Sequence, residues 1–373
     1  MQFKNLFELC NPKQWKTIST SDLQDEGYPV YGANGIIGCY NEYNHEEPTV
    51  LITCRGATCG EIHISQPKSY VTGNAMALDN LSREIDIKYL YYYLRDYDFK
   101  NIISGSAQPQ ITRQGLQKLI VKYPSLETQT KIVEVLDKCQ ALIDARKEQI
   151  RLMDGLIQSV FYEMFGDPVT NPKGWQVKKL LELLETQPQN GMYKPQDAYV
   201  NDGTGTPILR IDAFYNGKVV NWDLKRLKCN DDDIEKYGLK LDDIVINRVN
   251  SIEYLGKCAH IDNLVEPTVY ESNMMRFSID KEQVNPIYLT KLLSHNYVYN
   301  QILICAKKAV NQASINQQDV KSFDIVVPEI QLQNEFALKI YEIEKRKNEL
   351  LRSIEAMKDA YKSIMHTAFK GES

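Results

Sequence analysis

The most constraining feature of this sequence is an internal repeat, in which the second half of the chain echoes the first in the same order. Residues 11–15 (NPKQW) match residues 171–175 (NPKGW) at an offset of 160, and residues 51–55 (LITCR) match residues 244–248 (IVINR) at an offset of 193. Later matches lie at offsets of 199 and 204. Offsets that only increase indicate two copies of one fold, the second with loop insertions. We therefore predict a tandem duplication.

Each copy ends in a long helix with a heptad seam. Its apolar positions alternate in steps of four and three residues, the period of a coiled coil, and each position in the second copy lies 204 residues after its counterpart. One basic residue interrupts each seam, Arg146 in the first copy and Lys347 in the second. A helix over residues 127–165 would be roughly 58 Å long at about 1.5 Å per residue. The expected seam includes Ile132, Leu136, Ile143, Ile150 and Ile157 in the first helix and Ile340, Leu350, Ile354 and Tyr361 in the second.

So long a seam needs a partner, and the other repeat helix is the best one, although two helices packing on separate globular cores would be an alternative. The segments before the helices contain short β-rich runs separated by Gly, Asn and Pro turns. We predict an α+β fold with two globular domains joined by two long helices that form an antiparallel coiled coil, with pseudo-twofold internal duplication. The expected segments are 1–124 (first domain), 125–168 (first helix), 169–328 (second domain) and 329–373 (second helix).

Composition narrows the class of protein but leaves its function open. Hydrophobic residues make up 43% of the 373 residues and charged residues 25%, as in ordinary globular proteins. No 18-residue apolar run or signal-peptide pattern occurs in the sequence, which predicts a cytoplasmic protein. The net charge of −5 excludes nucleic-acid binding by bulk positive charge. If the chain binds DNA, it must use local polar and basic loops.

The motifs that would indicate an enzyme are missing or are better explained structurally. No phosphate-binding GxxxxGK[ST] motif and no strand–GxGxxG–helix unit occurs. Residues 285–288 (NPIY) resemble the NPPY signature of amino-methyltransferases, but a proline in the first turn of a helix explains them better. The acidic runs 231–233 and 242–243 lack the ExK of a metal-dependent nuclease. We expect no catalytic residue.

A metal site is not expected either. The eight cysteines contain no CxxC pair, and the spacing of Cys54 and Cys59 with His45 and His63 does not fit zinc. A zinc site at these four residues is the weaker alternative to scattered reduced thiols.

Loops with basic and amide side chains recur at corresponding places in both copies. Arginine reads guanine and Asn or Gln reads adenine, whereas Ser, Thr and Lys hold phosphates. Each loop alone also fits a plain surface turn, but their recurrence favours DNA binding, because two diverged domains on one spacer could read two short sequences a fixed distance apart. The candidate DNA-binding residues are Tyr31, Asn34, Arg55, Thr58, Lys68, Gln108 and Gln110 in the first copy and Asn247, Arg248, Asn250, Lys307, Lys308, Asn311 and Gln312 in the second.

Taken together, these motifs resemble the DNA-specificity subunit of type I restriction–modification systems over almost the whole chain. The features that carry the resemblance are the NPKxW segments, residues 35–40 (GIIGCY), residues 71–75 (VTGNA) and Asn247-Arg248 with residues 255–257 (LGK). A Pro–x–Leu/Ile–x–x–Gln pattern at both helix entries adds to it, with Pro124, Leu126 and Gln129 in one copy and Pro328, Ile330 and Gln333 in the other.

The resemblance implies a non-catalytic phage-defence subunit with two target-recognition domains, each reading one half of a bipartite, asymmetric DNA site. The coiled coil would set the spacer and dock two modification (methyltransferase) subunits, which carry S-adenosylmethionine and methylate adenine. Restriction subunits would bring ATP, Mg and nuclease activity, so this chain would bind no cofactor itself. Three alternatives stay open: a type IIB-like specificity subunit, a coiled-coil adaptor without DNA binding, and a self-contained methyltransferase or nuclease.

Overall fold

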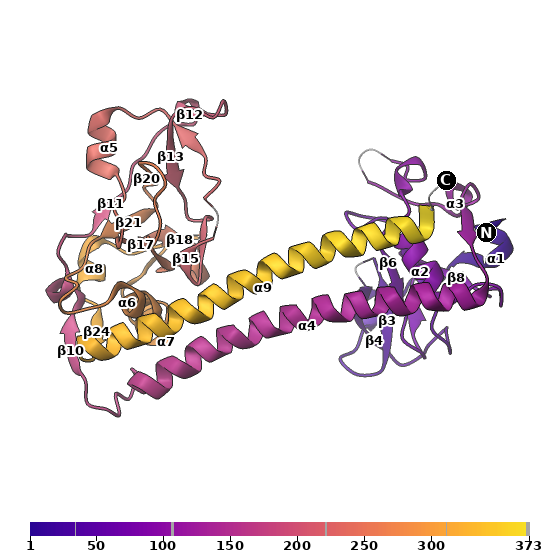
Figure 1. The fold of residues 1–373 in the computed structure, drawn as a ribbon, viewed down its shortest axis with the longest axis horizontal. Coiled ribbons are helices and arrows are strands. Elements are labelled where there is room, and N and C mark those ends of the chain that lie inside the picture. The colour runs from indigo at the N-terminus through magenta and orange to yellow at the C-terminus, as the bar shows by residue number, and fades with distance from the viewer. Residues whose placement is uncertain (34, 106–107, 221, 311, 371–373) are drawn as a thin grey trace. The chain divides into compact units, whose positions relative to one another are not determined.

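The computed structural model divides the chain into two compact units (Figure 1). It describes residues 1–33, 35–105, 108–220, 222–310 and 312–370. Unit 1 comprises Met1–Ile150 with Glu349–Ser373, and unit 2 comprises Arg151–Asn348. Two long helices, α4 (Leu126–Phe165) and α9 (Ile330–Lys370), each contribute one part to each unit. The four-segment division expected from the sequence therefore differs from the compact units, because each helix is shared between them.

Unit 1 is built on short, mostly antiparallel strands with helices beside them. Its four-stranded sheet has the order β2-β8-β5-β6, a three-stranded sheet has the order β4-β3-β7, and β1 pairs with β9. The strands are β1 (Gln2–Asn5), β2 (Asn11–Gln14), β3 (Tyr28–Gly32), β4 (Gly35–Tyr40), β5 (Val50–Thr53), β6 (Ile62–Ile64), β7 (Tyr70–Val71), β8 (Ala75–Asp79) and β9 (Ile120–Tyr123), and the shorter helices are α1 (Leu6–Leu9), α2 (Ile87–Asp96) and α3 (Arg113–Leu116).

Unit 2 repeats this plan with additional strands. Its sheets have the orders β11-β21-β17-β19-β15-β14, β12-β16-β13-β20, β18-β23-β22 and β10-β24. The strands are β10 (Gln176–Lys179), β11 (Gln189–Asn190), β12 (Tyr199–Val200), β13 (Thr206–Leu209), β14 (Phe214–Tyr215), β15 (Gly217–Val219), β16 (Arg226–Leu227), β17 (Ile244–Asn247), β18 (Val249–Asn250), β19 (Cys258–His260), β20 (Val269–Tyr270), β21 (Met274–Phe277), β22 (Lys307–Lys308), β23 (Ala313–Ser314) and β24 (Asp324–Val327), and the shorter helices are α5 (Asp231–Tyr237), α6 (Pro286–Leu293), α7 (Asn296–Cys305) and α8 (Gln317–Lys321).

The strand pairing corrects where the repeat begins. The first copy's NPKQW segment lies mainly in β2, which pairs with β8, whereas residues 171–175 precede β10. The strand equivalent to β10 is β1, because β1 pairs with β9 as β10 pairs with β24. Residues 2–9 (QFKNLFEL) thus correspond to residues 176–183 (QVKKLLEL), at an offset of 174. The match at an offset of 160 was wrong, since two similar short segments occur at different places in the fold, one in a strand and one in a turn.

The register of the central strands corrects a second correspondence by one residue. Thr53 pairs with Ala75 in unit 1, and Asn247 pairs with Met274 in unit 2. Ala75 and Met274 lie 199 residues apart, as in the predicted repeat, so Thr53 corresponds to Asn247 at an offset of 194 rather than 193. The counterpart of Arg55 is therefore Val249 rather than Arg248. A shift of one residue turns a strand side chain to the opposite face, so these two arginines face different surroundings.

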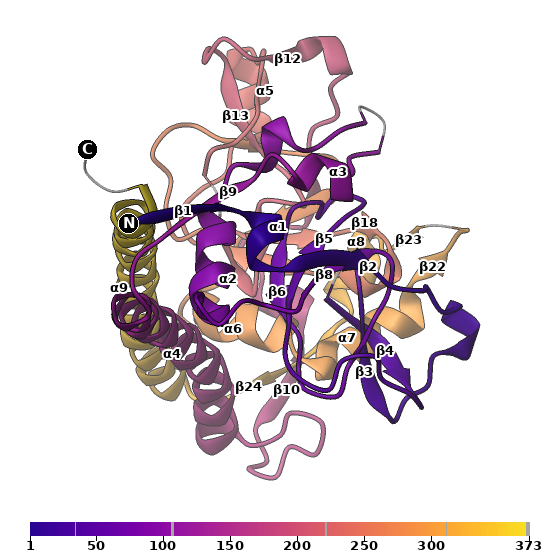
Figure 2. The same ribbon diagram turned by 90° about the vertical axis from the view of Figure 1, so that its right-hand side faces the viewer.

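The seam residues of the two long helices are buried together in each unit. In unit 1, the C-terminal part of α9 runs beside the N-terminal part of α4 (Figures 1 and 2). Leu136, Ile143, Ile354 and Tyr361 are all less than 8% exposed and belong to one hydrophobic core with the sheet residues, and Ile132 and Ile150 pack against it. In unit 2, Ile157 and Ile340 are buried in the hydrophobic core of that unit. Leu350, which belongs to unit 1, is half-buried. Gly166 ends α4 with a φ of 78°, a conformation that suits glycine.

One buried glutamine in each unit ties a long helix to its domain. Gln129 is fully buried, and its Nε2 donates to the carbonyl oxygens of Glu84 and Pro124, both at 2.9 Å, while its Oε1 accepts from the Asp86 N–H at 2.8 Å. Gln333 makes the same three bonds to Gln283, Pro328 and Asn285, at 3.2, 2.7 and 2.9 Å. This explains the Pro–x–Leu/Ile–x–x–Gln pattern as an anchor of the helix start.

Replacing Gln333 with alanine is therefore expected to destabilise unit 2 by about 2–3 kcal/mol, because each buried polar group left unpaired costs roughly 1–3 kcal/mol. Urea unfolding followed by circular dichroism would measure it. Gln331→Ala is the matched control, since Gln331 is exposed in the same helical turn. Equal midpoints for the two variants would contradict an anchoring role.

Candidate nucleic-acid interface

In unit 1, backbone hydrogen bonds bring two of the predicted loops together. Arg55 and Gln110 form an antiparallel bridge, and the Gly56 N–H donates to the Pro109 carbonyl oxygen at 3.3 Å. The Thr58 hydroxyl donates to the carbonyl oxygen of Ala33 at 3.0 Å, so this loop also meets the β3–β4 turn. The side chains of Arg55, Gln108 and Gln110 are exposed. Asn34 lies outside the described residues.

In unit 2, the small sheet β18-β23-β22 joins the predicted residues. Asn250 pairs with Ala313, and Ala313 in turn pairs with Lys308, so the two loops and the lysine strand form one surface. Lys307, Lys308 and Gln312 are exposed, whereas Asn250 is half-buried and its Oδ1 accepts from the Ser251 N–H at 2.8 Å. Asn311 lies outside the described residues. Each unit thus gathers a short cluster of side chains that can donate hydrogen bonds to bases or phosphates.

Burial removes two of the sequence-predicted residues from the surface. Tyr31 is 5% exposed, and its hydroxyl oxygen accepts from the Gln66 N–H at 3.1 Å. Asn247 is fully buried in β17, where its Nδ2 donates to the Tyr254 carbonyl oxygen at 3.4 Å. Both side chains point into the interior of their units, and the amino-acid composition of a loop does not show this. Their hydrogen bonds support the loops from inside, and the side chains do not form part of the surface.

Two further predicted residues, Arg248 and Lys68, do not join the exposed clusters. Arg248 is half-buried, and its Nη1 donates to the Ser272 carbonyl oxygen at 3.1 Å. Lys68 is exposed, has a φ of 52° and lies 3.8 Å from a carboxylate oxygen of Glu46. Its N–H also donates to the Glu46 carbonyl oxygen, so Lys68 belongs to a different loop from Arg55.

Lys257, which was not among the predicted DNA-binding residues, lies beside the cluster of unit 2. Its Nζ is 4.8 Å from the ring centre of Tyr215 and 5.0 Å from that of Tyr254. The Asn247 N–H donates to the Lys257 carbonyl oxygen at 2.8 Å, which fixes Lys257 next to the predicted loop. A hollow of about 340 Å³ between Lys257, Glu253 and Tyr299 adjoins it. The sequence feature that could have indicated this position is the spacing of Lys257 three residues after Tyr254.

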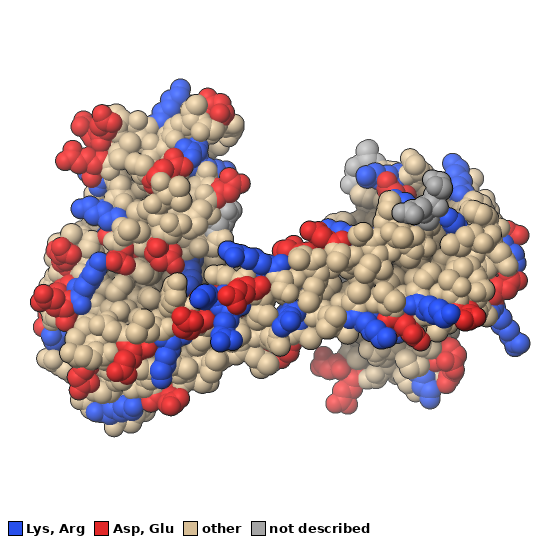
Figure 3. All heavy atoms as spheres, in the orientation of Figure 1, with Lys and Arg blue, Asp and Glu red and all other residues tan. Residues whose placement is uncertain are grey.

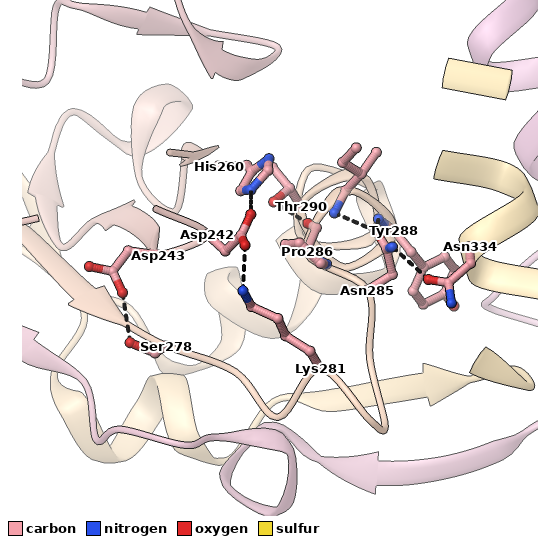
Figure 4. Close-up of polar contacts among 11 residues, drawn as sticks. Asp242, Asp243, His260, Ser278, Lys281, Asn285, Pro286, Tyr288, Thr290 and Asn334 are labelled. Carbon is pink, nitrogen blue, oxygen red and sulfur yellow. Dashed lines mark hydrogen bonds and ion pairs between the residues drawn. The ribbon is translucent and has the colours of Figure 1, made fainter. Parts of the chain in front are cut away.

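The segments that resembled catalytic motifs have structural roles (Figure 4). The Asn285 Oδ1 accepts from the N–H groups of Ile287 and Tyr288 and so caps α6, and Pro286 occupies the first turn. Asp86 caps α2 in the same way in the first copy. Asp243 accepts from the Ser278 hydroxyl at 2.6 Å, and burial raises the pKa of this carboxyl.

Neither a metal cluster nor a membrane-spanning helix is found in the described part of the chain. No three His, Cys, Asp or Glu side chains among those residues are placed to hold a metal ion. Burial raises the pKa of the Cys54 thiol to about 12, so this thiol stays protonated at neutral pH. Over the same residues, no helix is both long and apolar enough to cross a membrane.

Comparison with known proteins identifies the family. The family model described as the type I restriction modification DNA specificity domain matches residues 1–152 and 172–356. The chain belongs to this type I DNA-specificity family. Its two matched ranges are the two copies found in the fold, each with the start of its long helix.

Relatives of this family share parts of the sequence and the whole fold. The EcoKI specificity subunit of Escherichia coli K12 is 25% identical over 309 residues, 76% of this chain and 65% of the relative. The EcoprrI specificity subunit of Escherichia coli is 32% identical over 154 residues, 40% of this chain and 38% of the relative. The chain therefore matches less than two thirds of the length of either. The crystal structure of the type I S subunit from M. genitalium has a TM-score of 0.61 at 13% identity and covers 100% of this chain and 96% of its own, which shows a common fold.

Proposed function

We propose that this chain is the non-catalytic DNA-recognition subunit of a type I restriction–modification complex and that it reads a bipartite, asymmetric target with one domain per half-site. The observation that carries the proposal is the pair of corresponding exposed clusters on two copies of one specificity domain. The clusters differ, with Arg55, Gln108 and Gln110 in unit 1 and Lys307, Lys308 and Gln312 in unit 2. Different side chains at corresponding loops favour two different half-sites.

Charge distribution supports local recognition. On the face drawn in Figure 3, acidic and basic side chains of the described residues are interspersed, without one continuous basic surface. A chain with a net charge of −5 cannot rely on long-range attraction to the phosphate backbone. DNA would therefore be held by the loop clusters, with the remaining affinity coming from partner subunits.

The partners of the proposed complex are two methyltransferase subunits carrying S-adenosylmethionine and restriction subunits carrying ATP and Mg. Apolar side chains on the outer face of the long helix in unit 1 support docking of a partner: Val135 is 46% and Leu142 57% exposed. A hollow of about 430 Å³ also lies in unit 1 between residues 128–135 of α4 and residues 363–368 of α9. The length of the two helices, 40 and 41 residues, would set the distance between half-sites.

Long-read methylation mapping tests this function. A host carrying this gene together with its neighbouring modification gene should acquire one new bipartite motif with N6-methyladenine in each half. Cells with the modification gene alone are the control. If both proteins are expressed and no motif appears, the chain does not direct methylation, and the adaptor function becomes the better explanation. A type IIB-like partner set would be recognised by cleavage without separate restriction subunits.

Arg55→Ala should weaken recognition of one half-site without changing the fold. Arg55 is exposed, and a good bidentate contact to a base contributes about 1–3 kcal/mol. We expect methylation to relax at one position of the unit 1 half-site only, with an unchanged unfolding midpoint. Arg83→Ala, at another exposed arginine of unit 1, is the matched control. Equal effects on both half-sites would speak against base reading.

Arg248→Ala, unlike Arg55→Ala, should lower the stability of unit 2, because the Arg248 side chain donates a hydrogen bond to the Ser272 carbonyl oxygen.

A further inference from the structure

The seam in unit 2 contains an ion pair that joins the two long helices. Lys347 of α9 lies in the seam with only 14% of its side chain exposed, and its Nζ is 2.5 Å from Oδ1 of Asp154 on α4. Glu344, one turn earlier on α9, lies 3.8 Å from the same Nζ and is 13% exposed. A polar residue at a seam position costs stability but fixes which helices pair.

The neighbouring charges make Asp154 the group that completes this cluster. Lys218 lies 3.7 Å from Glu344, and Lys291 is close enough that Glu344 counteracts the fall in the pKa of Lys291 that burial causes. The domain contributes Lys218 and Lys291, and α9 contributes Lys347 and Glu344, so three positive charges surround one negative charge. Asp154 on α4 brings the second negative charge, and its loss would remove the nearer of the two carboxylates that lie against Lys347.

The repeat changes the charge at both of these positions. Residues of α4 and α9 correspond at an offset of 204, so the counterpart of Lys347 is Ile143 and the counterpart of Asp154 is Lys358. Because both helices carry the same heptad pattern, α9 could also pair antiparallel with α9 of a second copy. In the register that the repeat defines, Lys347 would then face Lys358 twice. Two α4 helices would place Asp154 against Ile143 twice.

We infer that the Lys347–Asp154 ion pair selects the pairing of α4 with α9 over the pairing of either helix with its own kind in a second copy. Only the mixed pairing brings opposite charges together at this place. The pairing of two α9 helices is opposed by like charges, and that of two α4 helices by an unpaired carboxylate beside an apolar side chain. Discrimination by such repulsive elements is a general route to partner specificity. This selection acts on helix type and does not depend on whether the chain binds DNA.

Two charge-balanced double variants of the full chain test the inference. D154K/K358D leaves the net charge unchanged, opposes the mixed pairing with like charges and gives two α9 helices opposite charges at both contacts. D154K/K347D also leaves the net charge unchanged and gives two α9 helices opposite charges as well, but it restores opposite charges in the mixed pairing. The two variants therefore differ in whether the mixed pairing is opposed or favoured. Size-exclusion chromatography with light scattering would give the fraction of particles at twice the 43.0 kDa chain mass. Co-expression of two differently tagged copies would measure their co-purification.

We expect D154K/K358D to show a several-fold larger two-chain fraction and more co-purification of the tags than D154K/K347D, which should match the unmodified chain. High salt should reduce the difference, since screening weakens exposed charge pairs. Equal two-chain fractions for the two variants would overturn the inference. So would a two-chain fraction of D154K/K358D no larger than that of the unmodified chain, because opposing the mixed pairing would then have no effect on the choice of partner.

Discussion

Replacing Phe336 with alanine is expected to lower the free energy of unfolding of unit 2 by about 3–5 kcal/mol, the usual cost of removing a buried phenylalanine ring. Phe336 lies one turn after Gln333 on α9 and is fully buried. Its ring centre lies 5.8 Å from that of Phe161 and 5.2 Å from that of Phe165, both on α4. Tyr288 of α6 completes the cluster at 6.4 Å. The ring therefore joins both long helices to the domain, and its loss leaves a cavity that three elements line.

Urea unfolding of the Phe336→Ala variant, followed by aromatic fluorescence, would measure this change. Leu338→Ala is the matched control, because Leu338 lies two residues further along α9 and is 68% exposed. We expect the control to shift the midpoint by much less. If both variants lost similar stability, the effect would come from helix propensity or solubility, and the aromatic cluster would not be what connects the two long helices to the domain.

Replacing Ile150 and Ile354 together with aspartate should have the second large effect, the loss of cooperative folding in unit 1. Ile354 is 4% exposed and shares a hydrophobic core with Leu136 and Ile143, and Ile150 packs against the same core. A buried carboxylate without a partner costs several kcal/mol or must take up a proton. Two of them exceed what one domain can tolerate at a typical stability of about 5–15 kcal/mol.

Hydrogen exchange read by mass spectrometry would localise the damage from Ile150→Asp with Ile354→Asp. Peptides of α4 and α9 within unit 1 should exchange rapidly, while α6 and α7 of unit 2 should retain their protection. Leu142→Asp with Leu351→Asp is the control, because these residues lie on the same two helices and are 57% and 48% exposed. Retained protection in the buried double variant would show that the heptad seam does not hold the helices together.

The long helices were the most predictable part of the fold, and the small sheets the least. A heptad period repeated over ten positions fixes both the helix and its buried face, so the expected range of 127–165 is close to the observed Leu126–Phe165. Strands such as β18 and β22 contain two residues each, too few for any alternation to show in the sequence. Their pairing depends on contacts between distant segments. The repeat was misaligned at its start for a related reason, because a short five-residue motif outweighed the weaker but correct match of residues 2–9 with 176–183.

The candidate site was predictable in its loops and much less so in its individual side chains. The loops at Arg55 and Gln110 meet in unit 1, and those at Asn250 and Lys308 are joined through Ala313 in unit 2. Exposure was not predictable, since Tyr31 and Asn247 turn inward through a strand register that only the paired sheet reveals. Lys257 was missed because its partners, two tyrosine rings, lie 42 and 3 residues away in the sequence.

The two buried glutamines also bear on how such a protein can change its specificity. The side chains of Gln129 and Gln333 form their hydrogen bonds to backbone groups among the described residues, namely one N–H and two carbonyl groups each. Backbone groups are present whatever the side chains are, so the attachment places no demand on the sequence of the domain apart from its path at that point. A recognition domain can therefore diverge, or be replaced by another with the same backbone turn, while the glutamine of the helix keeps its three hydrogen bonds. This attachment therefore permits one recognition domain to be exchanged for another.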